Sequence, residues 1–367
     1  MSAMHRALAA LFALSAGALP AAAQDVLKFR DPKTPDMPCE VFSLTYKTVE
    51  FEPAAAPGTR LKEDAKNILT IIPDPNRKTF DFAHAEQAYN GGELEEAAQR
   101  FERVRRDPRA PDLLRQLAAI SIVRCFWARD NIPGALAAIK NLRQDRPDSF
   151  FLLESYDYEI RCHLARRDEK AAAQALAEME AKGKEGLPEW TKLAEVRRGA
   201  VLELQGRPRD ALAVYRKYVR DRDVSEEAIL GELRCLRELG DWGGLNGRAQ
   251  QLLDELRGRK DAPARLLTGV YNARGEFLLN GGRVKDALLD FMQGVAVLNR
   301  GGETSREHET ALARAAFCCA KIAAQEKDKA KKDLYRSRAQ ELLAELERTY
   351  PSSALRSETA KAIQEAR

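Results

Sequence analysis

The chain has 367 residues and a mass of 41.0 kDa, with 44% hydrophobic, 32% charged and 7% aromatic residues. This composition excludes a collagen-like chain or a small disulfide scaffold, and it favours helices that bury many small side chains. Lys and Arg number 60 against 56 Asp and Glu, so the net charge is only +4. That balance excludes a partner bound by bulk charge alone, such as nucleic acid or an anionic membrane surface.

The first 23 residues have the three parts of a secretory signal peptide. A start containing Arg6 precedes an apolar run over residues 7–19, and small residues from Ala21 to Ala23 precede Gln24. As a helix this run spans about 20 Å, short of the roughly 30 Å hydrocarbon core of a bilayer. We therefore expect residues 1–23 to be removed and the mature protein to be exported, periplasmic or secreted, without stable membrane insertion. An uncleaved membrane anchor is the alternative.

Residues 24–75 contain short apolar runs that partly alternate with polar residues and are separated by Pro and Gly. This pattern predicts a small, barrel-like β module. From Gln24 to Thr79 nine acidic residues balance nine basic residues, which argues against an RNA-binding barrel and, with the net charge, against a nucleic-acid partner. We expect residues 74–77 to link it to the rest of the chain.

Beyond Thr79 the composition changes to Ala, Leu, Glu, Arg and Lys, with apolar residues at helical spacing. Residues 80–367 are therefore predicted to be amphipathic helices. The motif Asn90-Gly91-Gly92, flanked by helical patterns, recurs as Asn280-Gly281-Gly282. Similar breaks between helical patterns fall near Gly206 and Gly240. Such recurrence indicates repeated helical hairpins.

These hairpins resemble the tetratricopeptide repeat, a 34-residue helix-turn-helix unit. Three repeat positions carry the resemblance. The small residue that opens the second helix matches Ala97, Ala135, Ala172, Ala211, Ala287 and Ala339, with Leu245 a weak match. The large residue four positions later matches Phe101, Ile139, Leu176, Tyr215, Phe291 and Leu343, with Ala249 a weak match. The small or apolar position of the first helix reads Ala85, Val123, Ile160, Gly199, Leu233 and Gly275.

Two departures from the repeat are visible. Where a Leu usually precedes the small position of the first helix, this chain has His84, Ile122, Glu159, Arg198, Glu232 and Arg274, and a charged stretch over residues 325–338 interrupts the last unit. The resemblance still implies a mainly α chain, with six or seven hairpins stacked as a right-handed α-solenoid behind the β module. Small residues at helix crossings would let neighbouring hairpins pack closely and share one core.

The cysteines do not form a disulfide or metal framework. No C-x-x-C pair occurs, and the four histidines are scattered, so we expect neither a metal nor a cofactor. Cys125, Cys162 and Cys235 each stand ten residues before the hallmark residue of their unit. Repetition at one position favours buried structural thiols over a redox switch. We expect the adjacent pair Cys318 and Cys319 to be packing residues as well.

One residue before each of these cysteines stands an arginine: Arg124, Arg161 and Arg234. The resemblance places this position on the first helices, facing the groove that binds peptides, with Arg237, Tyr89 and Trp127 at the neighbouring position. A row of guanidinium groups would bind an acidic peptide or a C-terminal carboxylate. The alternative is a solvated, charged helix face.

Catalytic motifs are missing from the sequence. It has no phosphate-binding Gly-rich loop, nucleophile elbow or His-Glu metal pair. Acidic pairs such as Glu226 and Glu227 fall at helix starts, where we expect them to complement the helix dipole. We therefore predict a non-catalytic scaffold that binds a protein or peptide in the cell envelope. Alternatives are an envelope assembly or chaperone component that uses the β module as a second binding site, and, less favoured, an enzyme with a cryptic site.

Overall fold

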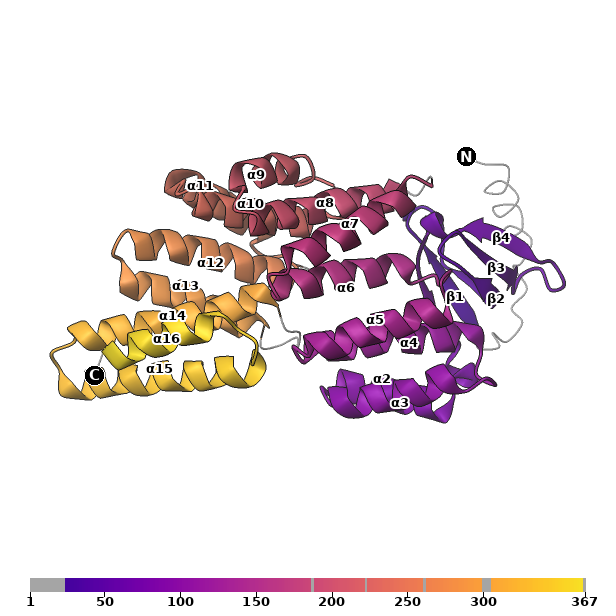
Figure 1. The fold of residues 1–367 in the computed structure, drawn as a ribbon, viewed down its shortest axis with the longest axis horizontal. Coiled ribbons are helices and arrows are strands. Elements are labelled where there is room, and N and C mark those ends of the chain that lie inside the picture. The colour runs from indigo at the N-terminus through magenta and orange to yellow at the C-terminus, as the bar shows by residue number, and fades with distance from the viewer. Residues whose placement is uncertain (1–23, 186–187, 222, 260–261, 299–304, 366–367) are drawn as a thin grey trace. The chain divides into compact units, whose positions relative to one another are not determined.

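The computed structural model describes residues 24–185, 188–221, 223–259, 262–298 and 305–365 (Figure 1). The expected signal peptide lies outside the described residues. The described chain is a five-stranded sheet followed by fifteen α-helices, which confirms the predicted order of a β module and a helical region. It divides into two compact units. Unit 1 comprises the described residues up to 127, with 132–162 and 177–191, and unit 2 comprises 128–131, 163–176 and the rest from 192.

The sheet is antiparallel, with strand order β4-β3-β2-β1-β5. Its strands are β1 (Asp25–Phe29), β2 (Met37–Leu44), β3 (Thr48–Pro53), β4 (Leu61–Asp64) and β5 (Ile68–Ile72). Buried and more exposed residues alternate along β1 and β3, so one face forms a core around Leu27, Val49 and Phe51. This alternation is the pattern from which strands were predicted.

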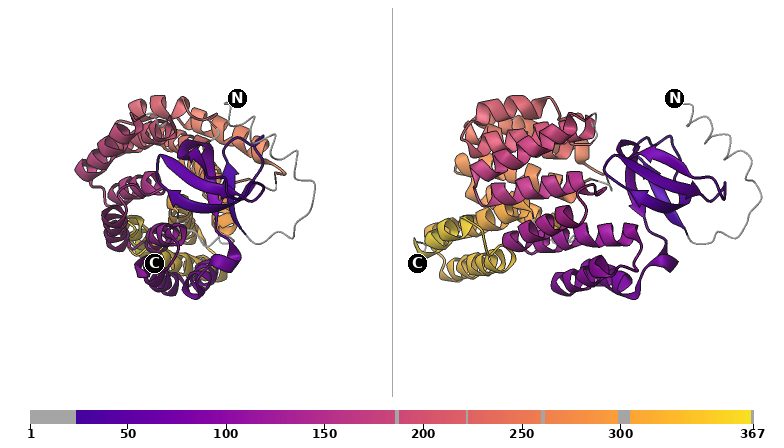
Figure 2. Two further views of the ribbon diagram at one scale, coloured as in Figure 1. Left: turned by 90° about the vertical axis from the view of Figure 1, so that its right-hand side faces the viewer. Right: turned by 45° about the vertical axis from the view of Figure 1, so that its right-hand side comes forward.

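The sheet is open, and in this respect the barrel-like expectation was wrong. β4 and β5 are its two edges and are joined by the short helix η1 (Ala65–Asn67). The apolar face packs instead against Leu113, Leu117 and Phe150 of the helical region. Helices therefore cover the core that a closed barrel would have covered with its own strands, and Figure 2 shows the sheet at one end of the neighbouring helices.

The expected linker is a structured turn. Residues Pro75–Arg77 form the short helix η2, and the carboxylate of Asp74 caps it by accepting from Asn76 N at 2.8 Å. Asp25 accepts from the backbone N–H groups of Asp74 and Val41. These bonds fix the end of the sheet region to the start of the helices.

The helices form seven consecutive pairs in the described chain, followed by one further helix (Figure 1). The pairs are α2 (Phe80–Asn90) and α3 (Leu94–Arg106), α4 (Asp112–Ala128) and α5 (Ile132–Asp145), α6 (Leu152–Ala165) and α7 (Glu169–Gly183), α8 (Pro188–Leu204) and α9 (Pro208–Arg216), α10 (Ser225–Glu238) and α11 (Trp242–Leu256), α12 (Ala264–Asn280) and α13 (Val284–Leu298), and α14 (Arg306–Gln325) and α15 (Lys329–Thr349). The further helix is α16 (Leu355–Glu365).

The repeat register is confirmed by burial. The hallmark residues of the second helices are fully buried, at 0% exposure: Ala97, Ala135, Ala172, Ala211, Leu245, Ala287 and Ala339. Gly199 of α8 faces Tyr215 of α9, and Gly275 of α12 faces Phe291 of α13. The last unit departs by one position, because Leu342 is fully buried and the expected Leu343 is only partly buried. Small residues therefore make room for the large residues of the following helix.

Candidate functional site

The six predicted groove residues lie on first helices of their hairpins and fall into both units. Tyr89 lies on α2, Arg124 and Trp127 lie on α4, and Arg161 lies on α6, all in unit 1. The remaining two, Arg234 and Arg237, lie on α10 in unit 2. The two groups are therefore treated as separate surfaces.

In unit 1, Arg124 makes a bidentate ion pair across two first helices. Its Nε and Nη2 donate to the two carboxylate oxygens of Glu154 on α6, at 2.7 and 2.8 Å. Burial acts to lower the pKa of Arg124, but the hydrogen bonds and charge of Glu154 outweigh it and raise that pKa. The fork of Arg124 is thus already matched to an internal carboxylate.

Arg161 lies over two aromatic rings. Its guanidinium carbon is 4.5 Å from the ring centroid of Trp127 and 4.8 Å from that of Tyr158, and the two rings meet edge to face at 6.0 Å. An oxygen of Asp157 lies 3.6 Å from Arg161 Nη1, which is longer than a hydrogen bond. Trp127, Tyr158 and Arg161 form what we call the Arg161 cluster. All three side chains are partly exposed, so the cluster combines aromatic faces with a cation at the surface.

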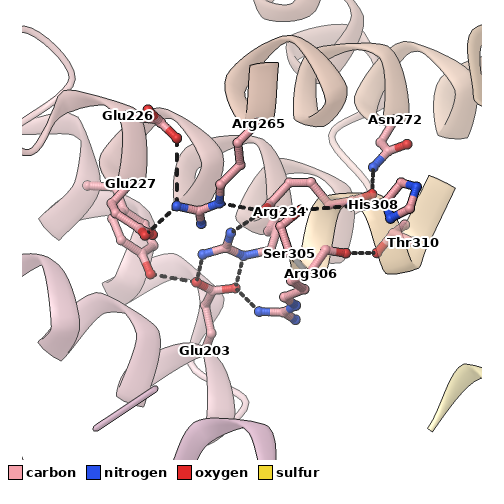
Figure 3. Close-up of polar contacts among 12 residues, drawn as sticks. Glu203, Glu226, Glu227, Arg234, Arg265, Asn272, Ser305, Arg306, His308 and Thr310 are labelled. Carbon is pink, nitrogen blue, oxygen red and sulfur yellow. Dashed lines mark hydrogen bonds and ion pairs between the residues drawn. The ribbon is translucent and has the colours of Figure 1, made fainter. Parts of the chain in front are cut away.

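Arg234 in unit 2 has a different environment. Its Nε and Nη2 donate to Glu203 of α8 at 2.8 and 2.9 Å, and its Nη1 lies 3.4 Å from Glu307 of α14 (Figure 3). The side chain of Arg234 is 17% exposed, and those of Glu203 and Glu307 are 7% and 6% exposed. We expected a solvent-facing arginine, and the structure places it inside a buried ion network instead.

The network continues along the first helices of unit 2. Arg265 of α12 donates to Glu307 at 2.8 Å and to Glu227 of α10 at 2.6 Å (Figure 3). Arg197 of α8 lies 3.4 Å from the same Glu227. Glu227 does lie in the first turn of α10, as expected, but its carboxylate also joins three helices, which the sequence did not indicate. We call these four residues, together with Arg234 and Glu203, the unit 2 ion network.

The network shifts the titration of its carboxylates. Burial acts to raise the pKa of Glu203, but the charge of Arg234 and its hydrogen bonds outweigh burial and lower that pKa below its ordinary 4.5. Burial also acts to raise the pKa of Glu307, but the charges of Arg265 and Arg234 outweigh burial and lower that pKa, with Arg265 contributing most. Both carboxylates are thus ionised at neutral pH despite their burial.

Arg237 forms a weaker contact than Arg234. It is 34% exposed and lies 3.6 Å from Glu276 of α12, which also accepts from Arg314 of α14 at 2.8 Å. Arg234 and Glu276 stand at the same repeat position, eleven residues before Leu245 and Ala287 respectively. Opposite charges at one repeat position on successive first helices are a sequence signal of internal ion pairing that we did not use.

The cysteines are packing residues. All six are buried, and Cys125, Cys162 and Cys235 are each 0% exposed, as their shared repeat position predicts. Burial raises the pKa of Cys235 to about 12, so its thiol is neutral at physiological pH. Burial also raises the pKa of Cys39 and Cys318 to about 12 and that of Cys319 to about 11.

Metal-binding clusters and membrane-spanning helices are both lacking in the described ranges. No group of three or more His, Cys, Asp or Glu side chains within them is arranged to hold a metal ion. None of the helices in those ranges combines the length and the apolar character needed to cross a membrane.

The helical pairs, the buried hallmark alanines and the glycines that face aromatic rings together place the chain among helical-hairpin repeats. The chain is similar to tetratricopeptide-repeat proteins. One solved structure like it is PilW, a widely conserved type IV pilus biogenesis factor (13% identity, 67% of this chain and 98% of the other, TM-score 0.40). Another is a tetratricopeptide repeat protein from Parabacteroides merdae (13% identity, 77% of this chain and 97% of the other, TM-score 0.48). A third is the C-terminal part of a repeat protein from Cytophaga hutchinsonii (13% identity, 76% of this chain and 98% of the other, TM-score 0.36). No protein-family model and no curated protein matches the chain.

Proposed function

We propose that this chain is a non-catalytic scaffold of the cell envelope that binds a protein or peptide partner through the Arg161 cluster. Its signal-like first 23 residues support export to the periplasm or beyond. The observation that carries the proposal is the stacking of Arg161 on Trp127 and Tyr158, at 4.5 and 4.8 Å. Aromatic residues and arginine dominate the binding energy of protein interfaces, because they bury large areas and still offer polar groups.

The charges around the cluster refine what the partner would be. Arg124 is matched by Glu154 through two short hydrogen bonds, whereas the Asp157 carboxylate lies 3.6 Å from Arg161, beyond hydrogen-bonding distance. A partner carboxylate that reached Arg161 would form a shorter, charge-assisted bond. We therefore retain an acidic segment as the proposed ligand, with Arg161 rather than Arg124 or Arg234 as its main contact.

Affinity capture from an envelope extract tests this proposal with matched variants. The bait is the mature chain from Gln24, compared with Trp127→Ala, Arg161→Gln and the control Lys140→Glu, an exposed position on the second helix α5. We expect one protein to be retained at near-equal stoichiometry by the wild type and by Lys140→Glu, and to be lost with the other two. Retention by all four baits would contradict the proposed surface.

A second candidate surface lies on the β module. Edge strand β5 carries exposed Leu69 and Ile72, at 55% and 41% exposure, and pairs with β1 on one side. An exposed apolar edge strand can accept a partner strand. This observation favours the alternative of an assembly or chaperone component. If Leu69→Lys loses the captured partner and Arg161→Gln keeps it, the β5 edge rather than the Arg161 cluster is the binding surface.

A further inference from the structure

Unit 1 contains a cavity of about 460 Å³ outside the Arg161 cluster. It lies between the end of α3, the first turns of α4 and the end of α5, and four arginines line it: Arg105, Arg106, Arg115 and Arg146. Asp145 is the one acidic residue of the lining. Arginine gathered in a cavity of this size is typical of a site for an anionic ligand.

Internal carboxylates neutralise these arginines only in part. Asp112 contacts both Arg115, at 3.1 Å, and Arg146. Glu102 is likewise shared, by Arg105 at 2.8 Å and Arg106 at 2.6 Å. With Asp145, which accepts from Arg105, three carboxylates contact the four guanidinium groups. One positive charge is therefore in excess around the cavity.

One donor at the cavity has no acceptor. Nε of Arg115 is buried and makes no hydrogen bond to any residue that the structure describes. A buried donor without an acceptor costs free energy, so a ligand oxygen that reached Nε by a small shift of the Arg115 side chain would be bound favourably. The neighbouring polar groups do not satisfy Arg115 Nε, because Ser149 Oγ and Gln116 Oε1 are hydrogen-bonded to each other at 2.8 Å.

The cavity is open to a ligand. The lining side chains of Arg106 and Arg146 are 72% and 40% exposed, whereas Leu142 and Ala119 are buried and give the cavity an apolar wall. Its volume lies within the range of roughly 300–1,000 Å³ that holds small organic molecules. A single inorganic ion would leave most of it unfilled.

We infer that this cavity binds a small organic anion whose carboxylate or phosphate oxygens accept hydrogen bonds from Arg115, Arg146 and Arg106. The apolar part of the ligand would rest on Leu142 and Ala119. The site is independent of the proposed partner surface, because it uses none of the residues of the Arg161 cluster.

Calorimetry on the mature full chain tests the inference, with citrate and pyrophosphate as separate probes at low ionic strength and pH 7. We expect saturable binding of at least one probe with a stoichiometry of one. Binding of citrate alone identifies a carboxylate ligand, and binding of pyrophosphate alone identifies a phosphate ligand. Failure of both probes to bind saturably would overturn the inference.

Variants separate the cavity from general surface charge. Arg115→Gln and Arg106→Gln should each weaken binding about tenfold or more, since each removes a charge-assisted donor. The control Arg103→Gln, on the same helix α3 and 64% exposed, should leave the dissociation constant within about twofold. Equal weakening in all three would overturn the inference.

A further variant should change the affinity in the opposite direction. Asp145→Asn removes the carboxylate that competes for Arg105 and should tighten binding several-fold. Weaker binding by this variant would contradict the inference. If circular dichroism shows that Arg115→Gln does not fold, the exposed Arg106 and Asp145 positions still decide the test.

Discussion

Gly199 of α8 faces the ring of Tyr215 so closely that an added Cβ would lie 2.7 Å from the ring carbons. An added Cβ at Gly231 of α10 would also lie less than 3 Å from carbons of the same ring, and the Tyr215 hydroxyl donates to Glu203 of α8 at 2.5 Å. The ring therefore packs closely against both α8 and α10, and its hydroxyl is bonded to α8. One aromatic side chain of a second helix therefore sets the spacing of two successive first helices in unit 2.

Gly199→Ala should destabilise the protein by about 1–2 kcal/mol. Overpacking against a ring that cannot move outweighs the gain in helix propensity. The control is Gly247→Ala in α11, where an added Cβ meets nothing within 4 Å, and it should stabilise by up to about 1 kcal/mol. Thermal unfolding of both variants checks the prediction. An equal increase in the unfolding temperature of both variants would show that the helices are not tightly packed at Tyr215.

Arg234→Gln should destabilise by about 3–5 kcal/mol at pH 7, because it leaves Glu203 charged and buried without its bidentate partner and leaves Glu307 with Arg265 alone. The exposed control Arg209→Gln should change stability by less than about 0.5 kcal/mol. Chemical denaturation of the two variants measures the difference. A small effect at Arg234 would mean that water reaches the network.

The unit 2 ion network should also make stability depend on acid. A carboxylate whose pKa is lower in the folded state stabilises the fold above its unfolded pKa, and this stability is lost as pH falls through the folded value. Glu203 and Glu307 should therefore contribute fully above pH 4.5 and lose their contribution progressively below it. In Arg234→Gln this acid-dependent loss should shrink, since protonated Glu203 needs no cation. If the free energy of unfolding depends on pH in the same way in the wild type and in Arg234→Gln, this prediction is contradicted.

The cysteines at the shared repeat position should be unreactive in the folded protein. With a pKa raised to about 12, Cys235 is almost wholly protonated at pH 8, and burial blocks reagents. Thiol labelling should be slow in buffer and fast in denaturant. Cys235→Ala should cost about 1 kcal/mol or less, and Cys235→Leu more, through overpacking. A peptide map that links any two of Cys125, Cys162 and Cys235 would refute the repeat alignment.

The β module should be an integral part of unit 1 rather than a separable appendage. Buried Gln116 of α4 donates to the Leu44 carbonyl of β2 at 3.0 Å and accepts from Ser149 Oγ and Phe150 N. Gln116→Ala should cost about 2–3 kcal/mol, since it leaves these groups without partners. The exposed control Gln87→Ala should be near neutral. Equal stability of both variants would indicate that the sheet is only loosely attached.

The sequence was informative where contacts repeat and misleading where they do not. The buried alanines such as Ala97 and the pairing of Gly199 with Tyr215 follow from one hairpin pattern, so a single chain suffices to predict them. The burial of Arg234 depends on Glu307, which lies 73 residues later on a helix two hairpins away. No local period encodes such a contact. The barrel was likewise expected because strand patterns alone do not reveal that Leu113 of a helix covers the sheet.

Site-specific photocrosslinking at Trp127 tests the central claim most directly. Replacing Trp127 with a photoreactive phenylalanine derivative keeps an aromatic ring beside Arg161, and the same group at exposed Lys140 is the control. In cells that export the chain, we predict a crosslink from position 127 to one envelope protein, weakened by Arg161→Gln and absent from position 140. Crosslinks of equal yield from both positions, or from position 140 alone, would contradict the assignment of the Arg161 cluster as the partner surface.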